Sequence, residues 1–66
     1  MDEEINVEYQ KALSGLRLEF GNLEHIRIAD SLKRIAKYER EKQTPKVRRD
    51  IIDLKKTVIY LIKMDF

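Results

Sequence analysis

Few residues in this chain have side chains suited to catalysis. The only histidine, His25, has no second histidine or carboxylate at a recognised ligand spacing, which favours a surface position near the start of a helix. Ser14 and Ser31 lack a recognisable activating pattern, and the chain contains no cysteine nucleophile and no glycine-rich phosphate loop. The sequence therefore predicts a protein that is not an enzyme and that uses no cofactor.

A group of acids at the N-terminus is the only candidate for binding a metal ion. Its members could attract a hard cation such as calcium weakly, but they lack the alternating ligands and the turn glycine of a dedicated calcium loop. We therefore predict no metal site. The acids are Asp2, Glu3, Glu4 and Glu8.

A basic segment in the middle of the chain is a candidate surface for an anionic partner. Residues 33–49 contain only two acidic residues, Glu39 and Glu41, among these bases. If the flanking helices are antiparallel, the charges gather at one end, where phosphates or the carboxylates of another protein would neutralise them. The alternative is a solvated loop that keeps the protein soluble. The candidate residues are Lys33, Arg34, Lys37, Arg40, Lys42, Lys46, Arg48 and Arg49.

Tyr38 lies among these bases, where an aromatic ring could stack on an unpaired nucleobase. The sequence contains no helix-turn-helix spacing, zinc-finger pattern or aromatic platform, so we do not expect sequence-specific reading of DNA. The preferred interpretation is that Tyr38 covers the end of the core with its hydroxyl group in water.

The segment that must position these charges is a long amphipathic helix predicted over residues 45–65. Thr44 can cap its first amides, and Pro45 suits the first helical position. The lysines and arginines of this segment, Lys55 among them, are expected on a hydrated face. Its core-facing residues recur at spacings of three and four and are Val47, Ile51, Leu54, Val58 and Leu61.

A second apolar row widens the face of this helix beyond what one neighbouring helix covers. Either the N-terminal helix covers the row, or the row stays open to a protein partner or to self-association. The candidate docking residues are Ile52, Ile59, Tyr60, Ile62 and Phe66.

Two further helices are predicted over residues 3–20 and 23–41. In the first, Ser14-Gly15 is a weak point that could end the helix early. Gly21-Asn22 separates the two helices, the glycine as a left-handed stop and the asparagine as a cap. Alternatively, Asp30-Ser31 could be the start of the second helix, which would leave residues 23–28 as a separate helical turn. The predicted stripe of the first helix is Ile5, Tyr9, Ala12, Leu13, Leu16 and Phe20, and that of the second centres on Ile28, Leu32 and Ile35.

Three helices joined by short loops predict an all-α fold, a small antiparallel three-helix bundle. We expect this bundle to form one domain over residues 1–66. The 66-residue chain has 39% charged residues and only two asparagines and two glutamines, a composition that leans toward a thermophile. Three acids follow Met1 where a signal peptide would be basic, so we expect a cytoplasmic protein. The longest apolar run is too short for a membrane span.

The C-terminal sequence IIDLKKTVIYLIKMDF bears a general resemblance to the helical domains of archaeal replication-complex subunits such as the GINS proteins. The resemblance covers one helix, carries no diagnostic motif and transfers no functional residue.

The function expected from the sequence is that of a non-enzymatic accessory protein. It would dock through the C-terminal helix or the basic end onto a larger assembly, such as a replication or transcription complex. The alternative is an autonomous DNA- or RNA-binding protein without sequence preference that uses residues 33–49.

Overall fold

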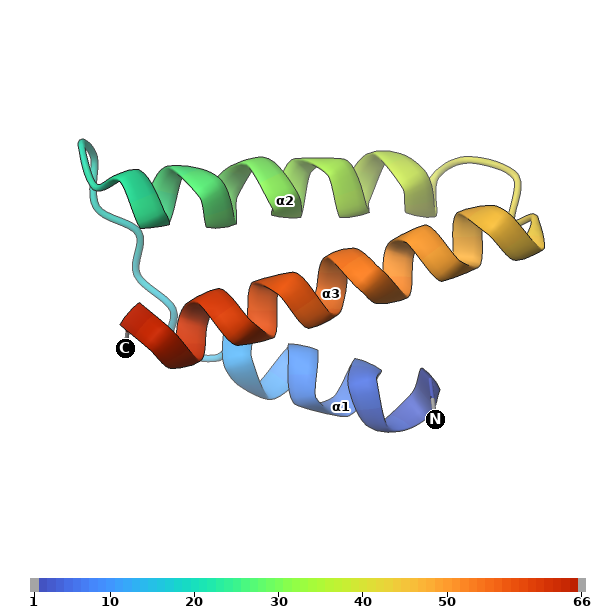
Figure 1. The fold of residues 1–66 in the computed structure, drawn as a ribbon, viewed down its shortest axis with the longest axis horizontal. Coiled ribbons are helices and arrows are strands. Elements are labelled where there is room, and N and C mark those ends of the chain that lie inside the picture. The colour runs from blue at the N-terminus through green and yellow to red at the C-terminus, as the bar shows by residue number, and fades with distance from the viewer. Residues whose placement is uncertain (1, 66) are drawn as a thin grey trace.

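The computed structural model describes residues 2–65, in which it has three α-helices and no strand. The helices are α1 (Asp2–Leu13), α2 (Leu23–Glu39) and α3 (Pro45–Asp65). In Figure 1 the chain runs along α1, returns along α2 and runs back along α3, so that α2 is antiparallel to both other helices. The predicted all-α three-helix bundle is confirmed.

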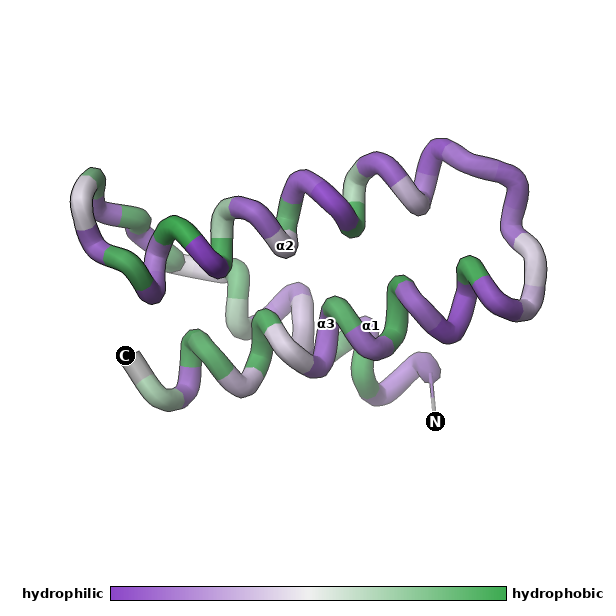
Figure 2. Tube along the Cα trace, turned by 45° about the horizontal axis from the view of Figure 1, so that its top comes forward, coloured by the Kyte–Doolittle hydropathy of each residue, from purple (hydrophilic) through white to green (hydrophobic). Residues whose placement is uncertain are grey.

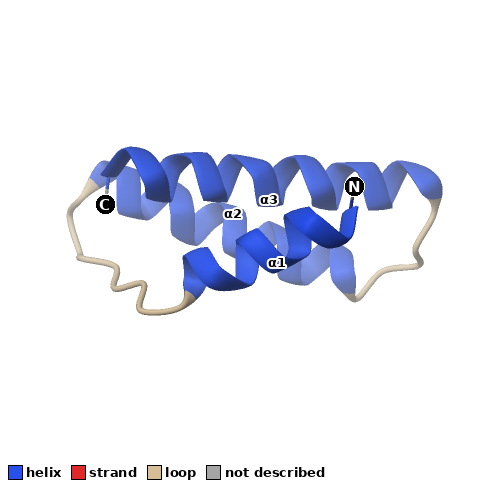
Figure 3. Cartoon of the chain, turned by 90° about the horizontal axis from the view of Figure 1, so that it is seen from below, coloured by secondary structure: helices blue, strands red, loops and turns tan. Residues whose placement is uncertain are grey.

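The central helix of the bundle is α3. It packs against α1 and against α2, whereas the backbones of α1 and α2 stay apart throughout residues 2–65. Figure 3 shows the short α1 in front, α2 behind it and α3 lying over both. The apolar face of α3 therefore has two neighbours, as its width predicted.

The core is a single cluster that runs along α3. Ile28 and Val58 are completely buried, and partly buried leucines and alanine pack around the cluster. Its buried members are Tyr9 from α1, Ile28 and Ile35 from α2, and Val58, Ile59 and Ile62 from α3.

The first helix ends at Leu13, so the predicted helix over residues 3–20 is too long. Gly15 has a φ of 79°, a left-handed conformation that glycine adopts without steric cost. The amide of Ser14 donates to the carbonyl oxygens of Gln10 and Lys11, which closes the last turn. The predicted stop at Gly21 is instead a turn with φ of 84° that precedes α2.

Phe20 is the clearest error in the predicted core. We expected it on the buried stripe of the first helix, but residues 14–22 form a connection, and the side chain of Phe20 is fully exposed. Leu16 remains half-buried and packs against the core. The helical spacing that linked the two residues does not apply beyond Gly15.

The starts of the other two helices agree with their predicted caps. The Asn22 side-chain oxygen accepts hydrogen bonds from the amides of Glu24 and His25, and the Thr44 hydroxyl oxygen accepts one from the amide of Val47 at 3.2 Å. Helix α2 is continuous through residues 30 and 31 and ends at Glu39, two residues before the predicted boundary.

The two ends of the bundle differ in polarity. Figure 2 shows a hydrophilic connection between α2 and α3 at one end, and apolar segments in the connection between α1 and α2 at the other. Because α2 and α3 are antiparallel, the C-terminal part of α2 and the N-terminal part of α3 lie at the same, hydrophilic end.

We predict that two isoleucines, two positions apart on α2, contribute unequally to the stability of the fold. Ile28→Ala removes a completely buried side chain and should lower the free energy of unfolding by about 2–5 kcal/mol. Ile26→Ala is the matched control, since Ile26 is 53% exposed, and should change it by less than about 1 kcal/mol. Urea unfolding at low protein concentration measures both, and equal losses would contradict the packing described here.

Candidate functional site

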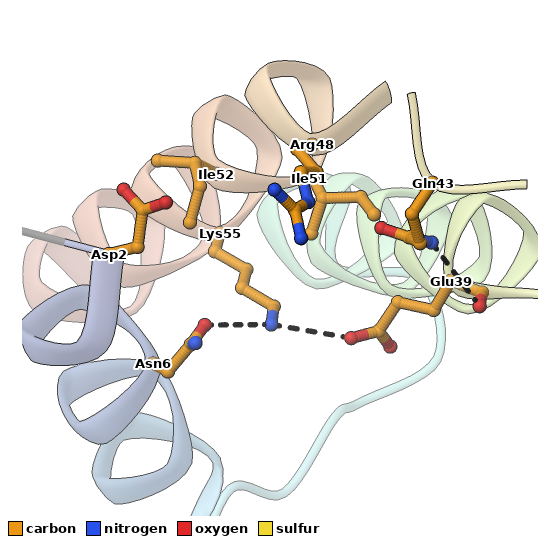
Figure 4. A pocket seen from close by; sticks show the side chains of 8 residues that line it. All are labelled: Asp2, Asn6, Glu39, Gln43, Arg48, Ile51, Ile52 and Lys55. Atoms are coloured by element: carbon orange, nitrogen blue, oxygen red, sulfur yellow. Dashed lines mark hydrogen bonds and ion pairs between the residues drawn. The ribbon is translucent and has the colours of Figure 1, made fainter. Parts of the chain in front are cut away.

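Lys55 lies in the middle of α3 with only 7% of its surface exposed. Its ammonium group donates to the Asn6 side-chain oxygen at 2.9 Å and to a Glu39 carboxylate oxygen at 3.3 Å. The same nitrogen stands 5.1 Å from the centre of the Tyr9 ring, close enough for a cation–π contact. Figure 4 shows Asn6, Glu39 and Lys55 converging from α1, α2 and α3.

The predicted position of Lys55 on a hydrated face is wrong. Lys55 follows Ile51 by one turn and precedes Ile59 by another, so it shares the buried side of α3. The aliphatic part of a lysine can cover apolar surface while its ammonium group reaches polar atoms. Lys55 does this at the junction of the three helices, where Asn6 and Glu39 supply the polar atoms.

The ion pair at this junction is only partly shielded from water. The Glu39 side chain is 51% exposed, whereas that of Lys55 is 9% exposed. Solvent screens an ion pair of this kind, and its net contribution is modest. The junction therefore stabilises the bundle through the packed lysine stem and two hydrogen bonds more than through the attraction between the charges.

The phenol of Tyr9 is held in its neutral form at the same junction. Burial of the ring raises the pKa of Tyr9 above its ordinary value of 10.0, and the negative charge of Glu39 raises this pKa further. The folded protein therefore holds the Tyr9 proton more tightly than the unfolded chain does. This contribution to stability is fully present below pH 10.0 and is lost as the pH rises through the folded-state pKa of Tyr9.

A pocket of about 410 Å³ surrounds the junction. It opens between α1 and α2, and Arg48 and Asp2 line it together with Lys55 and Glu39. The Gln43 amide nitrogen at its rim donates to the carbonyl oxygens of residues 38, 39 and 41, which caps the C-terminal end of α2. Both charge signs are thus present in the pocket, and its central lysine is already hydrogen-bonded.

All eight basic residues predicted as an anionic-partner surface are exposed. Those at the C-terminal end of α2, in the connection and in the first turn of α3 lie at one end of the bundle, as expected from antiparallel helices. Arg34 lies further along α2 and pairs with Asp30 at 3.5 Å. Lys33 also stands near the middle of α2. Most of the predicted basic surface therefore lies at one end of the bundle, whereas Lys33 and Arg34 lie further along α2.

A hollow of about 460 Å³ lies beside the start of α3 and is called the α3 hollow below. It contains charges of both signs together with apolar surface, because the start of α1 reaches this end of the bundle. Its lining residues are Asp2, Pro45, Arg48, Arg49, Ile52, Asp53 and Lys56.

Tyr38 is half-buried in a groove between α2 and α3. Asp50 and Asp53 line the same groove, with Arg34 beside them. Two carboxylates next to the ring would repel the phosphates that accompany a stacked nucleobase. The surroundings of Tyr38 therefore favour the interpretation that it covers the core.

The predicted docking row of α3 is divided by the fold. Ile59 and Ile62 are buried in the core cluster, so these two side chains are not open to a partner. Tyr60 is 62% exposed, and Ile52 is half-buried in the α3 hollow. Phe66 lies outside the described residues.

His25 is buried, which corrects the predicted surface position. Its Nδ1 atom accepts a hydrogen bond of 2.7 Å from the backbone amide of Glu19. The side chain therefore holds the connection between α1 and α2 against the first turn of α2. The sequence signal was its place three residues after the Asn22 cap, on the side of α2 that Ile28 and Ile35 continue.

An exposed apolar surface at this connection was not predicted, and we call it the apolar end. Two of its residues belong to the connection and two to the first turns of α2. Its members are Leu18, Phe20, Leu23 and Ile26. The signal in the sequence was the run of apolar residues around Gly15 and Gly21, which we had assigned to a longer helix.

Residues 2–65 contain no group of three histidine or acidic side chains that could hold a metal ion. Their helices also include none with the length and apolar character needed to cross a membrane. No protein-family model, curated protein or solved structure matches this chain.

The raised pKa of Tyr9 gives a prediction for alkaline solution. In a Tyr38→Phe/Tyr60→Phe background, ultraviolet absorbance should show tyrosinate forming with a pKa above 10.0. Glu39→Gln should lower this pKa, because it removes the nearby negative charge, but burial should keep it raised. Glu41→Gln, two positions further on, is the control and should leave it unchanged. A Tyr9 pKa at or below 10.0, or equal effects of the two substitutions, would contradict the described junction.

Proposed function

We propose that this chain is a non-enzymatic accessory protein that docks through the α3 hollow onto a carboxylate-bearing surface of a larger protein assembly. An assembly that handles nucleic acid, such as a replication or transcription complex, is the setting we favour. The observation that supports docking at this place is the composition of the α3 hollow.

The α3 hollow combines three features of protein-binding surfaces. Arg48 and Arg49 supply exposed guanidinium groups, which bind carboxylates through two parallel hydrogen bonds. Ile52 and Pro45 add apolar surface between the charges. Arginine is enriched in the cores of protein interfaces, where it contributes apolar contact as well as charge.

Charge at the start of α3 also favours an anionic partner. The first turn of α3 contains no acid, and its positive helix end is close to Lys46, Arg48 and Arg49. A carboxylate from a partner would relieve the repulsion among these groups. Asp2 and Asp53 relieve it in part, which leaves room for a partner of mixed charge.

A polyphosphate fits the α3 hollow less well than a protein surface does. A nucleic acid presents an unbroken row of negative charges, which would bring phosphates close to Asp2 and Asp53. A protein surface can place carboxylates opposite the arginines and a base or an amide opposite the aspartates. The mixed charge of the α3 hollow is therefore our reason to prefer a protein partner.

The second candidate function is autonomous binding of DNA or RNA without sequence preference. It is favoured by the exposure of all eight bases over residues 33–49. Such a protein would bind nucleic acid alone, and its affinity would fall about 10³–10⁵-fold between roughly 50 and 200 mM salt if six or more phosphates were contacted.

A matched pair of charge reversals tests the proposed docking surface. Arg48→Glu/Arg49→Glu should weaken binding to a partner isolated from the native organism and then purified, by at least about tenfold, the effect of losing roughly 1.4 kcal/mol. Lys11→Glu/Lys63→Glu makes the same change in net charge at the opposite end of the bundle and should leave binding unchanged. Calorimetric titration of the purified partner measures both affinities.

The same two variants distinguish the two candidate functions. Fluorescence anisotropy with a short single-stranded DNA should show little binding by the unmodified protein at about 200 mM salt. Strong salt-dependent binding that only Arg48→Glu/Arg49→Glu abolishes would replace the accessory role with nucleic-acid binding. Equal loss of partner affinity in both variants would place the docking surface elsewhere.

A further inference from the structure

The apolar end lies opposite the α3 hollow, so what covers it is a separate question from the proposed function. Leu18 is 40% exposed, Leu23 75% and Ile26 53%, and Phe20 is exposed to its full extent. Leu23 and Ile26 are three positions apart on α2 and therefore share one side of the helix. In Figure 1 this connection and the start of α2 lie at the end of the bundle away from the start of α3.

The local fold offers these side chains no cover. An apolar residue just before a helix cap often packs against the fourth residue of the helix, which here is Ile26. Gly21 occupies the position before the Asn22 cap and has no side chain to pack there. Phe20 stands one position further away and extends into solvent.

We propose that the apolar end pairs with the apolar end of a second copy of this chain. The exposed area is suitable for such a contact. Phe20 presents roughly 200 Å², and the three aliphatic side chains add on the order of another 200 Å². A standard interface buries about 800 Å² on each partner, of which somewhat more than half is apolar. The apolar end therefore supplies about the apolar area that one side of a small dimer needs.

The charges around the apolar end favour a second copy over other occupants. Arg17 and Arg27 are balanced by Glu19 and Glu24, and all four side chains are exposed. None of the four makes an ion pair with another side chain in residues 2–64. An anionic membrane or a nucleic acid would be attracted by the two arginines but repelled by the two glutamates, so these four charges give it no net attraction. A twofold-related copy brings the same mixture of signs, so each base can face an acid of the other copy.

Pairing at this end has a consequence for the shape of the assembly. One chain measures 34 Å along its longest axis, and its α3 hollow lies near the end that would remain free. The dimer would carry two α3 hollows pointing away from each other. Two linked sites bind a partner with repeated surfaces more tightly than one site does.

Sedimentation equilibrium from micromolar to millimolar protein concentration tests the pairing. The unmodified protein should form a dimer as its concentration rises. Phe20→Ser/Leu23→Ser should weaken dimerisation at least tenfold while the helical circular dichroism is unchanged, because both side chains are exposed. Val7→Ser removes an exposed apolar side chain from the middle of α1 and should leave the dimer intact. A monomer at every concentration, or a dimer insensitive to Phe20→Ser/Leu23→Ser, would overturn the proposal.

A charge exchange tests the orientation of the two copies. Arg17→Glu/Arg27→Glu makes all four of these positions acidic, and Glu19→Arg/Glu24→Arg makes all four basic. Each variant alone should dimerise more weakly than the unmodified protein, and an equimolar mixture should restore dimers. Failure of the mixture to associate better than either variant would contradict pairing through these charges. Binding of monomers to phosphatidylserine vesicles that is lost in Phe20→Ser/Leu23→Ser would assign the apolar end to a lipid surface instead.

Discussion

The width of the apolar face of α3 is the constraint on which the rest of the structure depends. Apolar residues extend around this helix further than one neighbour can cover, so α1 and α2 pack on its two sides without touching each other through their backbones. Lys55 stands where the two sides meet, and this position allows one ammonium group to reach both Asn6 and Glu39. The space between α1 and α2 is the pocket that Arg48 and Asp2 also line.

The two ends of the bundle then acquire different chemistry because the helices alternate in direction. Acids at the start of α1 meet bases at the start of α3, which turns a basic segment of the sequence into a surface of mixed charge. At the other end, Gly15 stops α1 early and leaves a connection in which Leu16 packs against the core while Leu18 and Phe20 stay exposed. A small protein with one charged end and one apolar end is suited to contact two different surfaces.

Sequence reasoning identified the helices whose ends carry strong local signals. Thr44 and Asn22 marked the starts of α3 and α2 because their side-chain oxygens accept hydrogen bonds from amides within the next three residues, and Pro45 suits the first helical position. It failed for Lys55, His25 and Phe20. Lys55 and His25 stand at helical spacing from buried residues but were assigned to the surface, and Phe20 lies beyond the end of α1. A lysine within an apolar stripe is buried only if another helix supplies acceptors, as Asn6 and Glu39 do. The mixed charge of the α3 hollow likewise required the position of Asp2 relative to α3, which follows from the parallel course of α1 and α3.

Native-state hydrogen exchange tests the central position of α3 most directly. Amides around Val58 should exchange only through global unfolding, because both other helices must leave before α3 is exposed. Amides of α1 should exchange with a smaller free energy, since this short helix packs against α3 alone. Protection that is highest in α2 and absent around Val58 would contradict this account and show that the bundle does not depend on α3.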